Sequence, residues 1–591
     1  MHWNNLGLLL DTLRVVSVQS LLIERMETIR LIAAISAERQ IPAFIWNLGQ
    51  KGFYEVHKSG DGVSFCKGEI VEAPEVWQAI SFVQHYSGRA IFIIENLQSM
   101  MQPQSQSIDS PSSAARLRSL LVNLLGEWLA KLETDRQTTV PYLVLLGTEA
   151  VELPTDLSNA IREIWKPLPT REEITAQIEA KLSGSPLASL QSFDKNALVL
   201  AASGLSLEEI NRGLTLGLRQ LAIAQACGAS AIASLPANRA GAVNQGSSVN
   251  ENQSSTLVDF LLEYKRDRLK QTLDIDFIAK SEVKDFGGLD RLRNIFAEVK
   301  NRYTAAAKTC NLPLPKGCLL VGPPGTGKSR AVKACAYQLG FPLAILDVGI
   351  IVARGVGYLR EIIRRLEALA PVVVGFDEFD KLFDTSRVGS NEATSNRQIL
   401  GTLLTWFQEK KSQVYVVATL NRLLSLPPEL TREGRFDHRV YVGFPQHIER
   451  KEVIQLHAAR FDPRYREGDG PLNEAEWRQI LNLTQNFTPA ELEQMIIKSA
   501  NAIFQSQYVA QPEQRISIEL NLAELLKQRA TIFTLFSTRT DEVLAMENQA
   551  RYVCEPASSP DSSIFAPPLT TFWGQRLDQT QASNGNNVAR S

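Results

Sequence analysis

The chain has 591 residues, of which 44% are hydrophobic and 21% are charged, and its formal net charge is −2. This composition is typical of a globular protein of several domains, and the near-neutral charge argues against a general affinity for nucleic acid. The six cysteines lack the paired spacing of a zinc ribbon or a disulfide framework, which indicates a reducing compartment.

Hydrophobic patterning divides the chain into five parts. Residues 1–235 alternate short aliphatic runs, such as "RAIFIIEN" and "PYLVLLG", with helical patterns, which predicts a layered α/β domain. Residues 236–256 are rich in Gly, Asn and Ser and are expected to form a flexible linker. A leading helix and a second α/β block follow over 257–445, then a helical region over 446–536 and a mostly disordered tail over 537–591.

Targeting segments are not expected. The first residues, "MHWNNLGLLLDTLRVVSV", lack the basic segment and the cleavage site of a signal peptide. No apolar run reaches the ~20 residues that a membrane helix needs. The sequence therefore predicts a cytoplasmic protein, or a stromal one in a plastid, with no membrane span.

The second α/β block carries a phosphate-binding motif. An aliphatic strand precedes it and a helical pattern follows it, which is the context that the motif G-x-x-x-x-G-K-[ST] requires. Backbone N–H groups of such a loop surround phosphate oxygens at a helix N-terminus. We expect Lys328 to reach the β- and γ-phosphates of ATP and Ser329 to bind Mg²⁺. The motif residues are Gly322, Pro323, Pro324, Gly325, Thr326, Gly327, Lys328 and Ser329.

Two acidic residues end the next buried strand, "PVVVGFDEFDKL". Asp377 is expected to hold Mg²⁺, and Glu378 to polarise the water that attacks the γ-phosphorus. Alone, two acids after an apolar strand indicate a solvated strand end. About fifty residues after a phosphate loop, they indicate a catalytic pair.

A third strand, "VYVVATLN", ends in Asn421, which we expect to contact the γ-phosphate and the attacking water. Arg432 and Arg435 follow in "LTREGRFD", and arginine suits bidentate contact with phosphate. On spacing alone, a turn asparagine and a solvated basic turn remain the alternatives.

Residues from "SEVKDFGGLDRLRN" to "NFTPAELEQMI" resemble an AAA-type ATPase of the classic clade. The resemblance implies an α/β fold: an AAA+ P-loop NTPase with a parallel sheet flanked by helices and a small helical lid. It also implies ATP and Mg²⁺ as cofactors and a homo-hexameric ring. In that family Asn421 is the sensor, and Arg432 and Arg435 act on the neighbouring subunit's nucleotide. Residues implied to lie near the adenine or face the nucleotide are Asp285, Gly287, His457 and Ala490.

A narrower resemblance joins the chain to conserved hypothetical AAA proteins of algal plastids and cyanobacteria. The segment "TWFQEK" directly before the sensor strand carries it. It implies a photosynthetic source and a long N-terminal region.

The two halves of the chain resemble each other. "YLVLLGTEAVELPTDL" (142–157) aligns without a gap to "YVVATLNRLLSLPPEL" (415–430), and "IIENL" falls on "GFDEF". Glu95 and Asn96 then stand where Asp377 and Glu378 stand, yet no glycine-rich loop precedes them. We interpret the N-terminal half as a degenerate AAA-like module. The alternative is that any two α/β domains share such a pattern.

These observations favour an ATPase that drives conformational change in a ring or in an unidentified protein partner, with a regulatory role. The alternative is an ATP-switched regulatory scaffold with little turnover. Gly355 stands where classic AAA remodellers carry the aromatic residue that grips a threaded chain, so threading is not expected. Two apolar clusters of the tail, Ile564-Phe565 and Phe572-Trp573, are expected to dock on a partner; the alternative is a loose tail.

Overall fold

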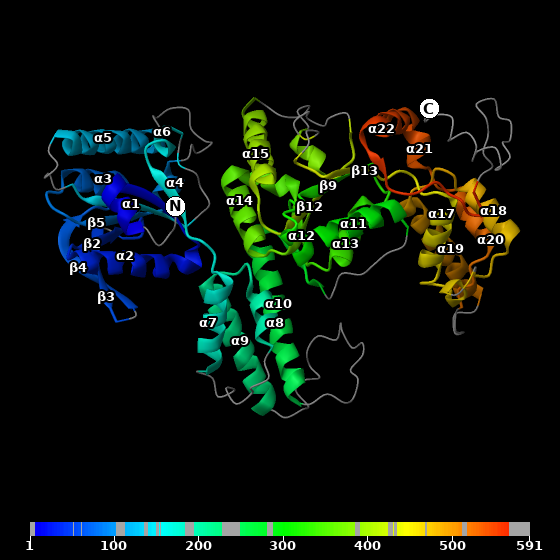
Figure 1. Cartoon of the computed structure of the whole chain (residues 1–591), viewed down its shortest axis with the longest axis horizontal. Coiled ribbons are helices and arrows are strands. Elements are labelled where there is room, and N and C mark those ends of the chain that lie inside the picture. Colours follow the sequence, from blue (N-terminus) through cyan, green and yellow to red (C-terminus); the bar gives the residue numbers. More distant parts are fainter. Residues whose placement is uncertain are drawn as a thin grey trace. The chain divides into compact units, whose positions relative to one another are not determined.

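The structure is a computed structural model. It divides into two compact units, Met1–Arg268 with Arg354–Leu369, and Leu269–Ala353 with Ala370–Ser591 (Figure 1). The residues that it describes are 6–50, 52–60, 62–101, 113–134, 140–148, 153, 155–183, 194–226, 249–280, 288–383, 390–423, 430, 434–466, 468, 470–510 and 517–566. Within these ranges, none of the helices has the length and apolar character needed to cross a bilayer.

Unit 1 contains a seven-stranded sheet in the order β4-β3-β2-β5-β6-β1-β7. The five strands from β2 to β7 in this order are parallel, and β3 and β4 extend the β2 edge as an antiparallel hairpin. The strands are β1 (Val15–Gln19), β2 (Ala43–Trp46), β3 (Gly52–Ser59), β4 (Gly62–Glu72), β5 (Ile91–Glu95), β6 (Tyr142–Gly147) and β7 (Arg162–Trp165).

Helices cover both faces of this sheet because side chains of a strand alternate between faces. Ile91 and Ile93 pack in one core with α1 and α2, whereas Phe92 and Ile94 pack in another with α3 and α5. This arrangement makes three layers. The helices are α1 (Leu6–Leu13), η2 (Leu22–Glu24), α2 (Arg25–Arg39), α3 (Val76–His85), α4 (Leu97–Met100), α5 (Ser113–Thr134) and α6 (Thr155–Ser158).

A helical group completes unit 1. It consists of α7 (Arg171–Ser183), α8 (Lys195–Ala202), α9 (Leu207–Ala226) and α10 (Val249–Leu273). Helix α10 packs closely on α9 because Gly213 and Gly217 carry no Cβ; a Cβ there would lie 2.9 Å and 2.7 Å from side-chain carbons of Leu261 and Leu257. The sequence placed this leading helix with the second α/β block, but its residues up to Arg268 belong to unit 1.

Unit 1 also includes most of α14 (Val348–Ala368). Arg365 of this helix is 1% exposed and donates to Glu209 Oε2 at 2.9 Å and to the carbonyl oxygen of Gly204 at 2.7 Å. Its Nε also donates to Glu361 Oε1 at 3.3 Å. Because burying charges is costly unless they are paired, this ion-pair cluster fixes α14 against α9.

Unit 2 contains a second seven-stranded sheet in the order β14-β13-β9-β12-β11-β10-β8. Its strands are β8 (Asp276–Ile278), β9 (Gly317–Val321), β10 (Leu343–Asp347), β11 (Val372–Asp377), β12 (Val414–Leu420), β13 (His438–Tyr441) and β14 (Glu555–Pro556). The core β13-β9-β12-β11-β10 is parallel, and in chain order its strands read 5-1-4-3-2. The core β7-β1-β6-β5-β2 of unit 1 reads the same, so the two halves share one sheet topology.

Helices α11 (Asp290–Arg302) and α13 (Lys328–Leu339) pack on the second sheet through a core that includes Phe296 and Leu339. The remaining helices of this α/β part are α12 (Ala305–Thr309), η6 (Phe379–Leu382) and α15 (Ser390–Glu409). A helical lid follows, with Trp477 and Met495 in its own core. It consists of α17 (His447–Ala458), η8 (Pro463–Arg466), α18 (Glu474–Leu483), α19 (Pro489–Ala510) and α20 (Leu522–Arg529).

The segment after the lid differs from the expected disordered tail. It forms α21 (Leu535–Thr538), α22 (Thr540–Val553) and β14, and then continues to Ala566. Phe565 is 6% exposed and packs in the lid core, so the predicted partner-docking cluster at Ile564-Phe565 has its aromatic ring within the chain itself. Phe572 and Trp573 lie outside the described residues.

Candidate nucleotide site

The phosphate loop of unit 2 joins β9 to α13. Gly325 and Gly327 have φ values of 82° and 97°, in the left-handed region that favours glycine. A Cβ at Gly322 would lie 2.1 Å from the carbonyl oxygen of Val442, so the loop also needs glycine there for a close approach. The sequence therefore forms a loop whose backbone turns inward at the start of a helix, the geometry of an anion site.

Lys328 is the first residue of α13 and is 6% exposed. Its Nζ donates to the carbonyl oxygens of Gly322 and Pro323 at 2.8 Å and 2.7 Å. Burial lowers the pKa of Lys328 to about 8, although nearby acidic residues oppose this shift. The ammonium group is thus held inside the phosphate loop, where an anion would restore its ordinary basicity.

Ser329 and Asp377 lie across from each other at the end of the loop. The hydroxyl of Ser329 is 3.2 Å and 3.4 Å from the two carboxylate oxygens of Asp377. Hydroxyl and carboxylate oxygens are ligands that Mg²⁺ prefers, and this ion takes few protein ligands when it also binds phosphate. The residues therefore fit a magnesium site completed by nucleotide and water.

Glu378 follows Asp377 with a left-handed φ of 52°. Its N–H donates to Thr419 Oγ1 at 3.0 Å, and the same hydroxyl donates to Asp377 Oδ1 at 2.6 Å. Thr419 thus fixes both acidic residues, a role that was missed in the sequence. The signal was a lone hydroxyl in the apolar strand "VYVVATL", beside the acid strand. The carboxylate of Glu378 also pairs with Lys381 Nζ at 2.6 Å.

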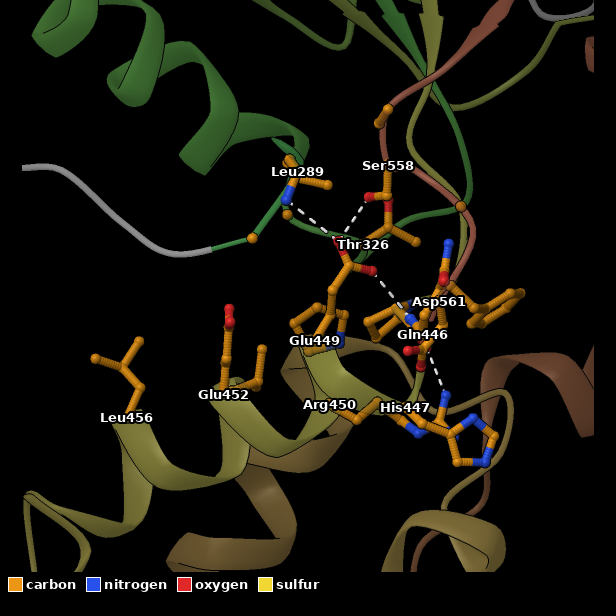
Figure 2. A pocket seen from close by; sticks show the side chains of 18 of the residues that line it. Leu289, Thr326, Gln446, His447, Glu449, Arg450, Glu452, Leu456, Ser558 and Asp561 are labelled. Atoms are coloured by element: carbon orange, nitrogen blue, oxygen red, sulfur yellow. Dashed lines mark hydrogen bonds between the residues drawn. The ribbon is translucent and has the colours of Figure 1, made fainter. Parts of the chain in front are cut away.

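A cavity of about 1040 Å³ opens beside the phosphate loop (Figure 2). Thr326 and Gly327 of the loop, Leu289 at the start of α11, and Glu449 and Leu456 of α17 are among the residues that line it. Such a volume is of the size that holds a cofactor between two subdomains. The cavity reaches from the phosphate loop to the lid.

Of the residues that the resemblance places near the base or facing the nucleotide, Ala490 lies close to the phosphate loop and His457 does not line the cavity. A Cβ at Gly325 would lie 3.5 Å from Ala490 Cβ, so Ala490 approaches the phosphate loop from the lid. His457 does not line the cavity: it is 1% exposed, and its Nδ1 lies 3.1 Å from Glu493 Oε1. Burial lowers the pKa of His457. Asp285 and Gly287 lie outside the described residues.

The sensor and arginine candidates follow β12. Asn421 lies directly after this strand, and its N–H donates to Asp380 Oδ1 at 3.4 Å, which places it beside the acid strand. Arg435 is partly buried in the turn before β13, and Arg432 lies outside the described residues.

Unit 1 has an acid strand of the same form. Asn96 follows Glu95 with a φ of 55°, as Glu378 follows Asp377, and its Oδ1 accepts from the N–H and the hydroxyl of Thr148 at 2.9 Å each. Arg25, the first residue of α2, donates through Nη2 to Glu95 Oε2 at 2.9 Å, and Asn47 donates to the same oxygen at 2.9 Å. The position that holds a phosphate loop in unit 2 is here occupied by an internal ion pair.

Helix α14 is kinked at Gly355, which has φ 82° and ψ −171°. Only glycine adopts this conformation readily. Tyr358 is 6% exposed, and Arg354 Cζ lies 4.9 Å from the centre of its ring. The segment that the AAA resemblance implies as the substrate-gripping loop therefore presents a backbone bend at Gly355 and a buried aromatic ring at Tyr358.

Comparison with known proteins agrees with this geometry. Residues 318–444 match the ATPase family associated with various cellular activities (AAA). The chain is 32% identical over 375 residues to the "Uncharacterized AAA domain-containing protein ycf46" of Gracilaria tenuistipitata var. liui, covering 61% of this chain and 68% of that protein. It is 31% identical over 373 residues to ycf46 of Pyropia yezoensis, covering 62% and 68%.

A more distant relative is the 26S proteasome regulatory subunit 6A of Saccharomyces cerevisiae, which is 27% identical over 262 residues, covering 42% of this chain and 58% of that protein. The match to ycf46 extends well beyond the AAA segment itself and spans more than half of this chain. The chain belongs to the ycf46 family of AAA domain-containing proteins.

Proposed function

We propose that the chain binds ATP with Mg²⁺ and hydrolyses it, and that the cycle changes the shape of a ring or of a bound protein partner. The observation that supports this proposal most strongly is that Lys328 is buried inside the phosphate loop and that the next residue, Ser329, contacts Asp377. A role in regulation within a photosynthetic organism is part of the proposal; the ycf46 relatives of Pyropia yezoensis and Gracilaria tenuistipitata var. liui support the photosynthetic setting alone.

In the proposed reaction, a water oxygen attacks the γ-phosphorus, the bond to the β–γ bridging oxygen breaks, and ADP and phosphate leave. Glu378 polarises the water and accepts its proton, and Asn421 orients the water against the γ-phosphate. Ser329 and Asp377 would hold Mg²⁺, which would supply positive charge against the phosphate oxygens when bound. Thr419 positions both acidic residues by its two hydrogen bonds.

Two substitutions test this division of roles. Lys328→Ala is expected to abolish ATP binding, because the loop loses its cation. Glu378→Gln is expected to keep binding and lose hydrolysis, because the amide cannot accept the proton. Calorimetry and phosphate release measure the two properties. Equal ATP affinity in Lys328→Ala and in the wild type would contradict the assignment.

We further propose a ring, most simply a homo-hexamer, in which Arg432 and Arg435 act on the neighbouring subunit's nucleotide. The AAA match supports this part of the proposal. Mixing Arg432→Ala and Lys328→Ala chains tests it, because some mixed interfaces combine an intact arginine with an intact phosphate loop. Activity should reappear on mixing. If the two variants assemble together and the mixture stays inactive, the proposal that these arginines act on the neighbouring subunit's nucleotide is wrong.

One contact favours the alternative of an ATP-switched scaffold with little turnover. Lys381 Nζ lies 2.6 Å from the Glu378 carboxylate and would compete with water for it. Both side chains are about half exposed, so the pair is weak. If this ion pair limits turnover, Lys381→Ala should raise the hydrolysis rate at saturating ATP. An unchanged rate would favour the ATPase over the scaffold with little turnover.

A further inference from the structure

The segment after α22 crosses the nucleotide cavity from the sheet to the lid. We call residues 555–566 the C-terminal strap. At its start, β14 pairs with β13 in parallel. The N–H of Ala557 donates to the Tyr441 carbonyl at 3.0 Å, and the carbonyl of Ala557 accepts from the Leu292 N–H at 3.0 Å. The beginning of the strap is therefore part of the α/β subdomain.

The end of the strap belongs to the lid. Asp561 Oδ2 accepts from the N–H of Ile448 at 3.2 Å, at the start of α17. Phe565 is buried in the lid core, and Lys451 Nζ lies 4.5 Å from the centre of its ring. Between these ends, the carbonyl of Ser559 accepts from Gln446 Nε2 at 2.8 Å. The strap thus ties the two subdomains that enclose the cavity.

Glu449 joins three segments at the wall of the cavity (Figure 2). Its Oε1 accepts from the Leu289 N–H at 3.2 Å and from the Ser558 hydroxyl at 2.6 Å, and its Oε2 accepts from the Gln446 N–H at 3.0 Å. Leu289, Glu449 and Ser558 all line the cavity. One carboxylate therefore holds the start of α11, the start of α17 and the strap around the same space.

We propose that Ser558 and the strap are a positioning element for nucleotide binding, closing the lid and the α/β subdomain around the purine base of ATP. The inference rests on the proposed function. Leu289 lines the same cavity as Thr326 and Gly327 of the phosphate loop, and Ser558 shares its carboxylate partner, Glu449. The strap would form one wall of the site for the base. The affinity for ATP should therefore depend on the contacts that hold the strap in place.

Ser558→Ala tests the inference with little change in packing. Its loss of a hydrogen bond to a carboxylate is expected to weaken ATP binding about tenfold, with the rate at saturating ATP unchanged. Ser558→Thr, which keeps the hydroxyl, should restore affinity. Ser506→Ala is the matched control: Ser506 is exposed on α19, and its hydroxyl donates within the same helix, to the Ile503 carbonyl. Calorimetry gives Kd, and phosphate release gives kcat.

Amide hydrogen exchange of the wild-type chain gives a second readout. ATP with Mg²⁺ should slow exchange at Ala557 and Ser559, and this protection should be absent in Lys328→Ala. Wild-type ATP affinity in Ser558→Ala, or strap exchange unchanged by bound ATP, overturns the inference and leaves the proposed function intact. No ATP binding by the wild type overturns both.

Discussion

The buried ammonium group of Lys328 makes ATP affinity depend on pH. Burial lowers its pKa to about 8, and the phosphates of bound ATP would raise it again because they supply the missing counter-charge. Above pH 8 the Lys328 side chain of the ATP-free protein is mostly unprotonated, so ATP binding must be accompanied by the uptake of a proton. At pH 9, one unit above this pKa, protonating Lys328 costs about 1.4 kcal/mol. The affinity for ATP should therefore fall about tenfold between pH 7 and pH 9.

The same shift predicts how the stability of the ATP-free protein changes with pH. The pKa in the folded protein is lowered from its ordinary value of 10.5 to about 8, so the protonated lysine disfavours the fold by about 3 kcal/mol below pH 8. Between pH 8 and pH 10.5 the unfolded chain binds the proton and the folded chain does not, so this penalty is relieved as pH rises.

The assay is calorimetry with ATP and Mg²⁺ from pH 7 to pH 9.5, in buffers of different ionisation enthalpy, which report proton uptake on binding. Lys328→Arg is the control, because a guanidinium group stays charged throughout this range. It should bind more weakly, since its planar group does not match the loop, but with a flat pH profile. A flat profile in the wild type, or an equal slope in Lys328→Arg, would refute the reasoning.

Three further outcomes are expected. Arg365→Met should lower the free energy of unfolding of unit 1 by about 3 kcal/mol, because Glu209 loses its buried partner and keeps the partly exposed Arg268, whose Nη2 lies 3.3 Å from Glu209 Oε1; hydrogen exchange in α9 measures this, and adding Glu209→Gln should recover part of the loss. Thr419→Val should slow hydrolysis about tenfold, or 1.4 kcal/mol in the barrier, with unchanged ATP affinity. Calorimetry should find one ATP per chain, since Arg25 and Glu95 close the corresponding position of unit 1; a second site would contradict that view.

Local motifs predicted from the sequence where the phosphate loop and the acid strand of unit 2 lie. A glycine spacing and an acid-ended strand specify short-range geometry, and the strand order of unit 2 brings Ser329 and Asp377 together as expected. The repeat of the sensor strand likewise predicted the shared topology of both halves.

Features made by long-range contacts could not be read in this way. The run "PASSPDSS" has the composition of a free tail, yet its backbone, hydroxyl and carboxylate groups find partners on β13, α11 and α17, more than a hundred residues away in sequence. The docking of α10 on α9 depends on Gly213 and Gly217, whose role is visible only once the helices are paired. Composition does not show which partners such a segment will meet.

The bend at Gly355 leads to the last prediction, that the protein does not unfold substrates by pulling them through a ring. Gripping a chain needs an exposed bulky side chain, and Gly355 has none while Tyr358 is buried. An aromatic residue at position 355 would be strained by about 1–3 kcal/mol, because φ 82° with ψ −171° suits glycine alone. The backbone conformation at Gly355 therefore disfavours an aromatic residue at this position.

The measurement is ATP-dependent loss of fluorescence from a stably folded reporter that carries an unstructured tail. The wild-type chain should leave the reporter folded while it hydrolyses ATP, and Glu378→Gln sets the level without hydrolysis. Robust unfolding by the wild type that disappears in Arg354→Ala or Tyr358→Ala would show that this segment grips after all. Unaltered hydrolysis in Arg354→Ala would then separate loss of grip from loss of the ATP cycle.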